Sequence, residues 1–310
     1  MTGPGPAAVA PWRPVSSCGR DCLRPAPPTV GHLRRALRIG AFLLLLAHLP
    51  LLALTVLAGR RASDAAYRWF LRGTLRSMGV RRTVRGTHHR TGGGPAPLVV
   101  GDHTSWLDVA VLPAVLPVRL VSRADLRRWP VIGWLAVIGR SIYVDRDRLS
   151  TLPRSVAAVA AALRGGDAVA AFAEGTTWCG AARGRYRPAA FQAALDAGAA
   201  VLPVALRYHV AGRTVTAASF VGDMTAAESL RNTAAIRGLT VEVTLLPPIP
   251  AGAAPDRRSL AALAEHAVDA HGPAVRRCRA RHCPAPHATC TRCGTTEALA
   301  PRRHGLCNPS

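Results

Sequence analysis

The chain has 310 residues, a net charge of +23 and 49% hydrophobic residues, which is enough apolar material for one large domain or two small ones. All 40 Lys/Arg positions are arginine, and a positive charge of this size predicts anionic partners such as lipid headgroups, phosphorylated substrates or nucleic acid. Aromatic residues make up only 5%, and the body of the chain has no helix-turn-helix, RNP or zinc-finger pattern, so nucleic acid is the disfavoured partner.

The eight cysteines are unevenly placed. Cys18 and Cys22 lie near the start, Cys179 stands alone in the middle, and five more follow residue 277. A secreted scaffold held by disulfides would spread them through the fold, so we expect a reducing compartment for the globular part. The late cysteines and the histidines between them have zinc-ligand chemistry, but their short proline-containing spacing favours a disordered Cys/His/Pro-rich tail over residues 272–310.

The first part of the chain contains a candidate membrane segment. Residues 1–30 are rich in proline, glycine and alanine without periodicity, which predicts disorder. Residues 39–59 form an apolar run close to the roughly 20 residues that cross a bilayer. His48 and Pro50 raise the cost of insertion, so a full span, a helix half-sunk in one leaflet and a buried core helix all stay open. We expect residues 31–62 to be a membrane-associated helical segment, with the following domain on the cytoplasmic side of the cell membrane.

A basic amphipathic helix is predicted directly after this run. Ser63 and Asp64 are suitable helix caps, and three arginines share one face of the helix. The apolar positions at helical spacing are Tyr67, Phe70, Leu71, Thr74, Leu75 and Met78. The pattern fits a helix on a membrane surface and a helix packed on the domain equally well.

From Val80 onward, short apolar strands alternate with helices. The predicted strands are 80–85, 97–101, 117–121, 141–144, 168–172, 201–206, 214–220 and 239–245. The predicted helices are 106–115, 131–138, 152–164, 188–197, 225–236 and 257–271. This alternation predicts an α/β fold with a mostly parallel central sheet flanked by helices, forming one domain over residues 63–271.

The first chemical motif is DHTSWLD, residues 102–108, directly after the strand LVVG. Ligands of open α/β sheets bind at the carboxyl ends of the strands, where His103 is expected. Asp108, five residues on, falls in the first turns of the next helix and can bring its carboxylate back to one imidazole nitrogen. The other nitrogen is then free to take a proton from a hydroxyl. His103 is therefore the candidate base and Asp108 its partner.

Two further strand ends carry polar residues. RSIYVDR (residues 140–146) ends in Arg146, whose guanidinium can hold a phosphate. AVAAFAEGTTW (residues 168–178) ends in Glu174, Gly175, Thr176 and Thr177. There a glycine lets backbone amides approach an anion, and the carboxylate can bind a polyol or orient an arginine.

Together with the apolar strand VLPVALRY (residues 201–208), these segments resemble the glycerolipid acyltransferases, the family that includes lysophosphatidic acid acyltransferases. The resemblance runs from about residue 64 to about residue 250. The N-H-x4-D motif matches at His103 and Asp108, G-x-I-F-I-D-R at Ile142 to Arg146, F-P-E-G-T at Phe172 and Glu174 to Thr176, and V-P-V-A at Pro203 to Ala205.

The resemblance implies the reaction and its partners. A fatty acyl group would move from acyl-CoA or acyl carrier protein to a hydroxyl of a lysophospholipid, first of all 1-acylglycerol-3-phosphate, with no metal or prosthetic group. His103 would be the base, and Arg146, Glu174 and Gly175 would bind the glycerol phosphate of the acceptor. The acyl chain would lie in an apolar channel that opens towards the bilayer.

Several positions depart from the family pattern. Asp102 replaces an asparagine, Arg140 a glycine and Ala173 a proline, and Thr177 and Trp178 replace the arginine-containing end of the third motif. Nearby Arg183, Arg185 and Arg187 are candidate substitutes for that arginine. The alternative is an acceptor without a phosphomonoester, such as a lyso-ornithine lipid.

Two other interpretations stay open. A basic membrane-bound protein that kept the fold and lost activity would also show a degraded third motif. Cys179 could be acylated, although an inert small side chain is the favoured reading. No G-x-S-x-G elbow is present in the sequence, which argues against a covalent serine intermediate.

Overall fold

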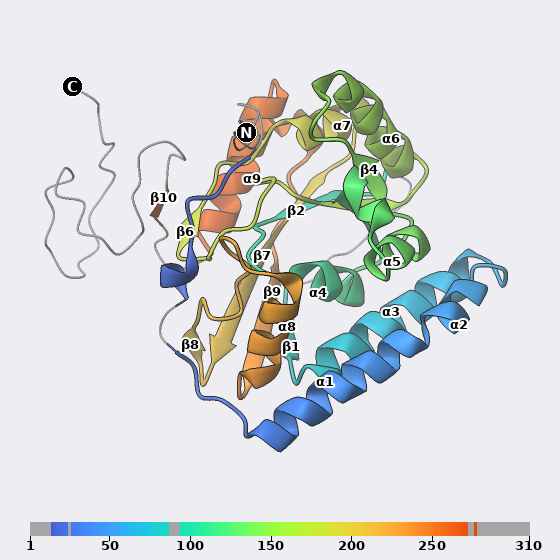
Figure 1. Cartoon of the computed structure of the whole chain (residues 1–310). Coiled ribbons are helices and arrows are strands. Elements are labelled where there is room, and N and C mark those ends of the chain that lie inside the picture. Colours follow the sequence, from blue (N-terminus) through green and yellow to red (C-terminus); the bar gives the residue numbers. More distant parts are fainter. Residues whose placement is uncertain (1–13, 24–25, 87–93, 272–275, 278–310) are drawn as a thin grey trace, which may run out of the picture.

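The computed structural model describes residues 14–23, 26–86, 94–271 and 276–277. Their core is an eight-stranded sheet with the order β1-β9-β7-β2-β5-β3-β4, to which β8 adds at β7 (Figure 1). The strands are β1 (Arg81–Arg85), β2 (Leu98–Gly101), β3 (Val118–Arg123), β4 (Ile142–Val144), β5 (Ala168–Phe172), β7 (Val201–Val210), β8 (Arg213–Thr214) and β9 (Leu239–Leu245).

Most of this sheet is parallel. Strands β7, β2, β5, β3 and β4 run in one direction, while β9 pairs antiparallel with β7, and β1 pairs parallel with β9. The predicted fold class is confirmed. We call the side of the sheet on which these five parallel strands end the carboxyl edge. The side on which they begin is the amino edge.

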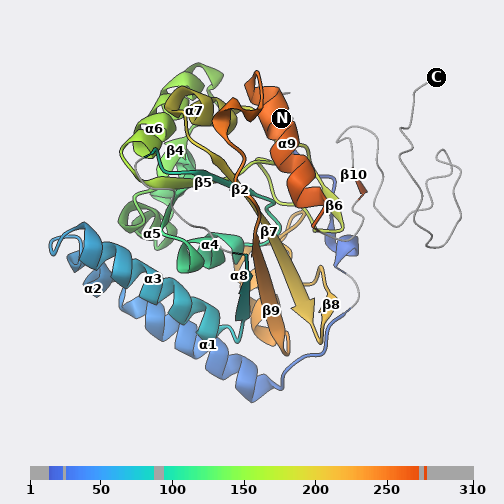
Figure 2. The ribbon, with the colours of Figure 1, turned by 180° about the vertical axis from the view of Figure 1, so that it is seen from behind.

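Helices cover both faces of the sheet, as Figure 2 shows from behind. The covering helices are α3 (Arg60–Ser77), α4 (Asp108–Val115), α6 (Leu152–Arg164), α7 (Ala189–Ala197) and α9 (Arg257–Asp269), with α5 (Ile132–Ile138) and α8 (Ala226–Ala235) at the sides. Because alternate side chains of a strand point to opposite faces, Val99 packs with α3 and α4, whereas Leu98 and Val100 pack with α6, α7 and α9. Two apolar layers therefore fix the plane of the sheet.

The apolar run forms two helices, α1 (His32–Ala47) and α2 (Leu49–Leu54), which lie along α3 (Figure 1). Among the described residues, His32–Leu54 is the one helical stretch long and apolar enough to cross a membrane. Its outer face exposes large apolar side chains, among them Leu37 and Leu44. Arg38 donates hydrogen bonds to the carbonyls of Ala234 and Ile236, which ties α1 to the domain.

The start of α3 differs from the prediction. The helix begins at Arg60, and its N-cap is Gly59, without a side-chain hydrogen bond. Ser63 and Asp64 lie inside the first turns, so the predicted caps are wrong, and the expected domain boundary at residue 63 falls within the helix. The predicted apolar face is buried against the domain, since Phe70, Leu75 and their neighbours at helical spacing are almost fully covered.

The described part of the first 30 residues is ordered against the domain, contrary to the prediction for 1–30. The amide of Val30 donates to Ala235, and Thr29 forms a β-bridge with Ile236. Cys18 and Cys22 are buried, and η1 (Arg20–Cys22) forms a short turn between them. These backbone groups find their partners at the carboxyl end of α8 (Ala226–Ala235), far along the sequence. Residues 1–13 and 24–25 lie outside the described residues.

Two other predicted segments are residues 214–220 and the tail, residues 272–310. Residues 214–220 were predicted as a strand, but only Arg213–Thr214 pairs as β8. The rest of this segment is a loop, because the carbonyl of Ala218 and the amide of Phe220 bond to the loop after β2. Of the tail, the structure describes only β10 (Arg276–Arg277), which pairs with β6 (Ala182–Arg183). The remainder of 272–310, with its predicted disorder and its zinc alternative, lies outside the described residues.

Candidate active site

His103 and Asp108 meet at the carboxyl edge. The histidine follows β2 directly and the aspartate opens α4, so the loop of four residues between them folds the carboxylate back onto the ring. Nδ1 of His103 lies 2.9 Å from Oδ2 of Asp108. Because this nitrogen faces a carboxylate, we assign the proton of a neutral imidazole to it, which leaves Nε2 as a hydrogen-bond acceptor.

The carboxylate of Asp108 is completely buried, and both of its oxygens accept hydrogen bonds. Its Oδ2 also accepts the backbone amides of Thr104 (2.7 Å) and Ser105 (2.8 Å), and its Oδ1 accepts the hydroxyl of Tyr208 at 2.5 Å. These donors hold the carboxylate in one orientation, and the carboxylate in turn holds the ring. The His103 side chain is 20% exposed, against 0% for Asp108, so the imidazole is the member of the pair that substrate can reach.

The ring is fixed from a third side. It stacks on Phe172 at the end of β5, with ring centroids 4.3 Å apart and planes inclined by 14°. The carbonyl of His103 accepts the amide of Trp178 at 2.8 Å. Orientation of the imidazole therefore comes from two neighbouring strand ends as well as from its own loop.

Glu174 lies behind His103. Its Oε2 accepts the amide of His103 at 2.8 Å and its Oε1 accepts the amide of Gly184 at 2.9 Å. Burial, reinforced by the nearby charge of Asp102, raises the pKa of Glu174 well above its ordinary value, and the two amides offset only part of this. The side chain is 2% exposed. Both oxygens thus serve the backbone of the site, a different set of contacts from the acceptor contact expected from the sequence.

Asp102 forms a buried charge network beside this group. It accepts the hydroxyl of Tyr186 (2.9 Å) and pairs with Arg183 and Arg207, each at 3.1 Å. Burial raises the pKa of Asp102 to about 6, although Arg183 acts in the opposite direction. Arg183 is also paired with Asp269 and is 4% exposed, so it is not placed to bind substrate in the role that its sequence position suggested.

A cavity of about 350 Å³ adjoins the carboxyl edge and gathers three of the predicted site residues, Arg146, Gly175 and Thr176. Arg146 donates a hydrogen bond to the carbonyl of Gly175. Gly175 has a φ of +76°, and a Cβ on it would lie 2.8 Å from Pro14, so both the turn and the packing demand glycine. The remaining lining residues carry both signs of charge: Arg123 and Arg128 with Asp125, Asp145 and Asp147.

The residues that follow Thr176 in the sequence do not line this cavity. Thr177 is half-buried, and Trp178 is buried at 3% exposure. Arg185 and Arg187 are exposed, and the stem of Arg187 runs beside Gly175. Of the three arginines suggested as replacements for the family arginine, Arg187 is therefore the best placed.

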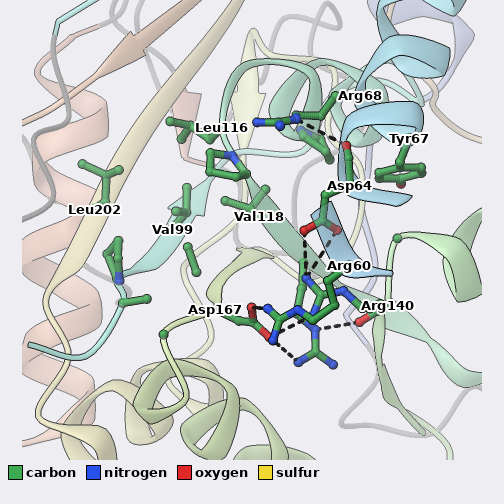
Figure 3. Close-up of a pocket in the computed structure, with 18 residues that line it drawn as sticks. Arg60, Asp64, Tyr67, Arg68, Val99, Leu116, Val118, Arg140, Asp167 and Leu202 are labelled. Carbon is green, nitrogen blue, oxygen red and sulfur yellow. Dashed lines mark hydrogen bonds and ion pairs between the residues drawn. The ribbon is translucent and has the colours of Figure 1, made fainter. Parts of the chain in front are cut away.

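A second cavity of about 380 Å³ lies at the amino edge, between the strand starts, α3 and the end of α4 (Figure 3). One wall is apolar, with Val99, Val118 and Leu202. The other holds an ion-pair cluster around Asp167. Its carboxylate oxygens lie 2.5 Å from the guanidinium of Arg60 and 3.1 Å from those of Arg119 and Arg140. None of the predicted site residues lines this cavity.

Sequence reasoning missed Tyr208, Phe172 as a stacking partner, and the Asp102 network. Tyr208 and Arg207 end the fourth motif on β7, and β7 pairs with β2, so that motif carries polar partners for the first one. The available signal was the end of VLPVALRY, where the polar pair Arg207 and Tyr208 follows a continuous apolar run. Arg140 has a φ of +51°, a conformation that favours glycine, which accounts for the glycine of the family pattern; in this chain the arginine at that position pairs with Asp167.

Comparison with known proteins supports the same reading. Residues 81–207 match the family model described as Acyltransferase. The chain is 35% identical over 216 residues to the lyso-ornithine lipid O-acyltransferase of Brucella abortus (strain 2308), covering 65% of this chain and 79% of that enzyme. It is 30% identical over 184 residues to the 1-acyl-sn-glycerol-3-phosphate acyltransferase of Neisseria gonorrhoeae, covering 57% of this chain and 72% of that enzyme.

A solved structure shares the fold. The crystal structure of the 1-acyl-sn-glycerophosphate acyltransferase of Thermotoga maritima aligns with a TM-score of 0.52 and 16% identity, covering 75% of this chain and 95% of that one. At this identity the likeness concerns the fold alone. The two sequence relatives, matched over 79% and 72% of their own lengths, decide the family: the chain is an acyltransferase and belongs to the glycerolipid acyltransferase family.

Proposed function

We propose that the chain transfers a fatty acyl group from an acyl thioester, either acyl-CoA or acyl carrier protein, to the hydroxyl of a lysophospholipid, with 1-acylglycerol-3-phosphate as the first candidate. The observation that carries the proposal is the contact between Nδ1 of His103 and the buried carboxylate of Asp108. It leaves Nε2 of a partly exposed imidazole as the base.

In the proposed reaction, Nε2 of His103 takes the proton of the acceptor hydroxyl as its oxygen attacks the thioester carbonyl. Asp108 stabilises the imidazolium that forms. The tetrahedral intermediate then collapses, the carbon–sulfur bond breaks, and the leaving thiolate takes the proton back from His103. A thioester is already activated, so we propose that the reaction needs no metal or prosthetic group. General-base assistance of this kind contributes about 10²–10⁴-fold.

The roles of the other predicted residues follow from their positions. Arg146, Gly175, Thr176 and Thr177 are proposed to bind the acceptor headgroup, since the first three line the cavity beside the carboxyl edge and Thr177 follows them. Glu174 is proposed as a positioning residue for His103, because both of its oxygens accept backbone amides.

A lyso-ornithine lipid is the second candidate acceptor. Arginine is absent at Thr177 and Trp178, where the family pattern has one. Arginines and aspartates alternate around the 350 Å³ cavity, and Arg123 and Asp125 form an ion pair there. A headgroup that carries an amine and a carboxylate matches such mixed charge better than a phosphate dianion does.

We also propose that α1 and α2 attach the enzyme to one leaflet of the cell membrane, with the domain on the cytoplasmic side. Large apolar side chains of this pair, including Leu37, Leu44 and Leu51, face outward, while Arg38 binds carbonyls of the domain. Exposed Trp134 and Val137 on α5 extend the apolar surface, since α5 contacts α2. A helix held along the domain in this way fits interfacial attachment better than a full span.

The test is an acyl-transfer assay on the purified full chain in lipid vesicles. Labelled acyl-CoA and acyl carrier protein are each offered with lysophosphatidic acid and with lyso-ornithine lipid, using wild type and His103→Ala. The proposal is supported if wild type forms product with either acceptor and His103→Ala does not. The acceptor that yields product is then identified. Equal product from His103→Ala, or unchanged lipid composition in cells that carry only this variant, would instead favour the non-catalytic alternative.

A further inference from the structure

Three cysteines from segments far apart in the sequence meet beside the active-site loop. Cys18 and Cys22 belong to the N-terminal segment (residues 14–23), and Cys179 follows the third motif. Their sulfur atoms all lie within 4.8 Å of one another, and the residues are 4%, 2% and 1% exposed. All three thiols are free of disulfides.

Backbone amides point at these sulfur atoms. The amide of Cys179 donates to Sγ of Cys18 at 3.4 Å. The backbone amides of Ala181 and Ala182 are hydrogen-bonded to the thiol of Cys179. Gly180, with a φ of +82°, makes the turn that brings these amides round. Packing of cysteines as small apolar side chains requires no such donors, whereas bound thiolates are stabilised by them.

We infer that Cys18, Cys22 and Cys179 form a binding site for a thiophilic divalent cation, of which Zn²⁺ is the chemically fitting choice. Thiolates bound to one zinc ion at about 2.3 Å lie about 3.8 Å apart in tetrahedral geometry, so the three sulfur atoms need to close by about 1 Å at most. Three protein ligands leave the fourth position to a water molecule or another small donor. This inference goes beyond the acyl-transfer reaction, in which the cysteines take no part.

The cation would fasten the N-terminal segment to the walls of the active site. Pro14 packs over Gly175, the carbonyl of Cys22 accepts the hydroxyl of Thr216, and the carbonyl of Cys179 accepts the hydroxyl of Ser219. The amide of Trp178, next to Cys179, holds the carbonyl of His103. Metal binding therefore closes a loop of more than 150 residues around the site, and its loss is expected to lower thermal stability more than catalytic rate.

The first experiment measures the metal content of the full chain, purified without chelator, by elemental mass spectrometry. We compare wild type, Cys22→Ala, Cys179→Ser, and a control in which Cys278, Cys283, Cys290, Cys293 and Cys307 are all changed to serine. About one zinc ion per chain is expected in wild type and in the tail control, with at least a fivefold loss in Cys22→Ala and Cys179→Ser. The inference would be overturned if the tail control lost the metal while Cys22→Ala and Cys179→Ser kept it. It would also be overturned if the wild-type chain took up no added zinc.

A second experiment guards against misfolding of these variants. Co²⁺ is added to metal-depleted wild type, Cys22→Ala and Cys22→His, and the absorption spectrum is recorded. Wild type should show a sulfur-to-cobalt charge-transfer band and strong tetrahedral visible bands, Cys22→His should keep a shifted version, and Cys22→Ala should lose both. Equal spectra for wild type and Cys22→Ala, or a disulfide between any two of the three thiols in a peptide map of the native chain, would refute the cation site.

Discussion

At the carboxyl edge of the sheet, burial raises the pKa of both Asp102 and Glu174. At the amino edge, burial also acts to raise the pKa of Asp167. The positive charges of Arg140 and Arg60 outweigh this effect, so the pKa of Asp167 is lowered. The amino-edge carboxylate binds three guanidinium groups near the surface. Glu174 instead receives two backbone amides in the interior. Cations surround the carboxylate of the amino edge, while at the carboxyl edge Glu174 and Asp108 hold the backbone amide and the ring of His103.

The comparison shows why cavity size does not locate the chemistry. The larger cavity, about 380 Å³, lies at the amino edge, where the carboxylate of Asp167 is paired with three arginines. The cavity of about 350 Å³ adjoins the edge where a partly exposed imidazole is held by a buried carboxylate. A base needs an accessible nitrogen with a fixed proton on the other side, and His103 supplies one at this edge, held by a carboxylate.

The largest effect is expected for Glu174→Gln. The amide group of glutamine places a donor against one of the two backbone amides that Glu174 now accepts, so His103 should shift. A shift of about 1 Å costs about 100-fold in rate, and we expect kcat to fall by that order with the KM for the acceptor unchanged. Glu265→Gln is the matched control, because Glu265 accepts the amide of Tyr186. A raised acceptor KM with kcat intact would show instead that Glu174 binds substrate.

Tyr208→Phe should have a smaller effect at the same edge. It removes the hydroxyl that Oδ1 of Asp108 accepts and leaves a buried carboxylate oxygen without that donor. We expect a loss of about 1–3 kcal/mol in stability and about tenfold in kcat, measured by denaturant unfolding and initial rates. Tyr67→Phe, which changes a buried tyrosine of the amino-edge cavity, should leave kcat unaltered. Equal effects of the two changes would remove the distinction between the edges.

Asp167→Asn addresses the amino edge directly. The change weakens three ion pairs whose acidic partner is 15% exposed, and we expect a loss of about 1–2 kcal/mol in unfolding free energy with kcat nearly unchanged. Since the folded pKa of Asp167 is lowered, the stabilisation is present above the ordinary aspartate pKa of about 3.9 and is lost as pH falls through the folded value. Urea unfolding at several pH values checks this. A stability difference that persists in strong acid would contradict it.

The sequence predicted the carboxyl edge in outline because each motif follows its own strand. His103, Arg146 and Glu174 are each the second residue after a strand, these strands run parallel, and such ends meet at one edge. The contacts between motifs depended on strand order, which local pattern does not specify. Tyr208 reaches Asp108 across 100 positions of sequence because β7 lies beside β2.

Errors arose where loops supply the hydrogen bonds of a strand or a cap. Residues 214–220 have strand composition, but their backbone groups bond to the loop that contains Thr104 and Ser105. The cysteine trio was invisible for the same reason, since Cys179 and the N-terminal segment come together only in the folded chain. Composition predicted disorder for residues 1–30 because they are rich in proline, glycine and alanine and show no periodicity.

The smallest effect, and the sharpest contrast between the edges, is expected for Asp102→Asn. At pH 7 the lost pairs with Arg183 and Arg207 and the relief of a buried charge oppose each other, so the change in unfolding free energy should stay within about 1 kcal/mol. The folded pKa of about 6 lies above the unfolded value of about 3.9, so between these values the folded chain binds more protons than the unfolded chain. Wild-type stability relative to Asp102→Asn should therefore decrease as pH rises from about 4 to about 6 and stay constant above, opposite in sign to the trend for Asp167. Unfolding free energies of wild type and both variants from about pH 2 to about pH 7 test it, because this range covers the Asp167 window below about 3.9 and the Asp102 window above it. Slopes of the same sign for the two aspartates would show that both edges handle buried charge alike.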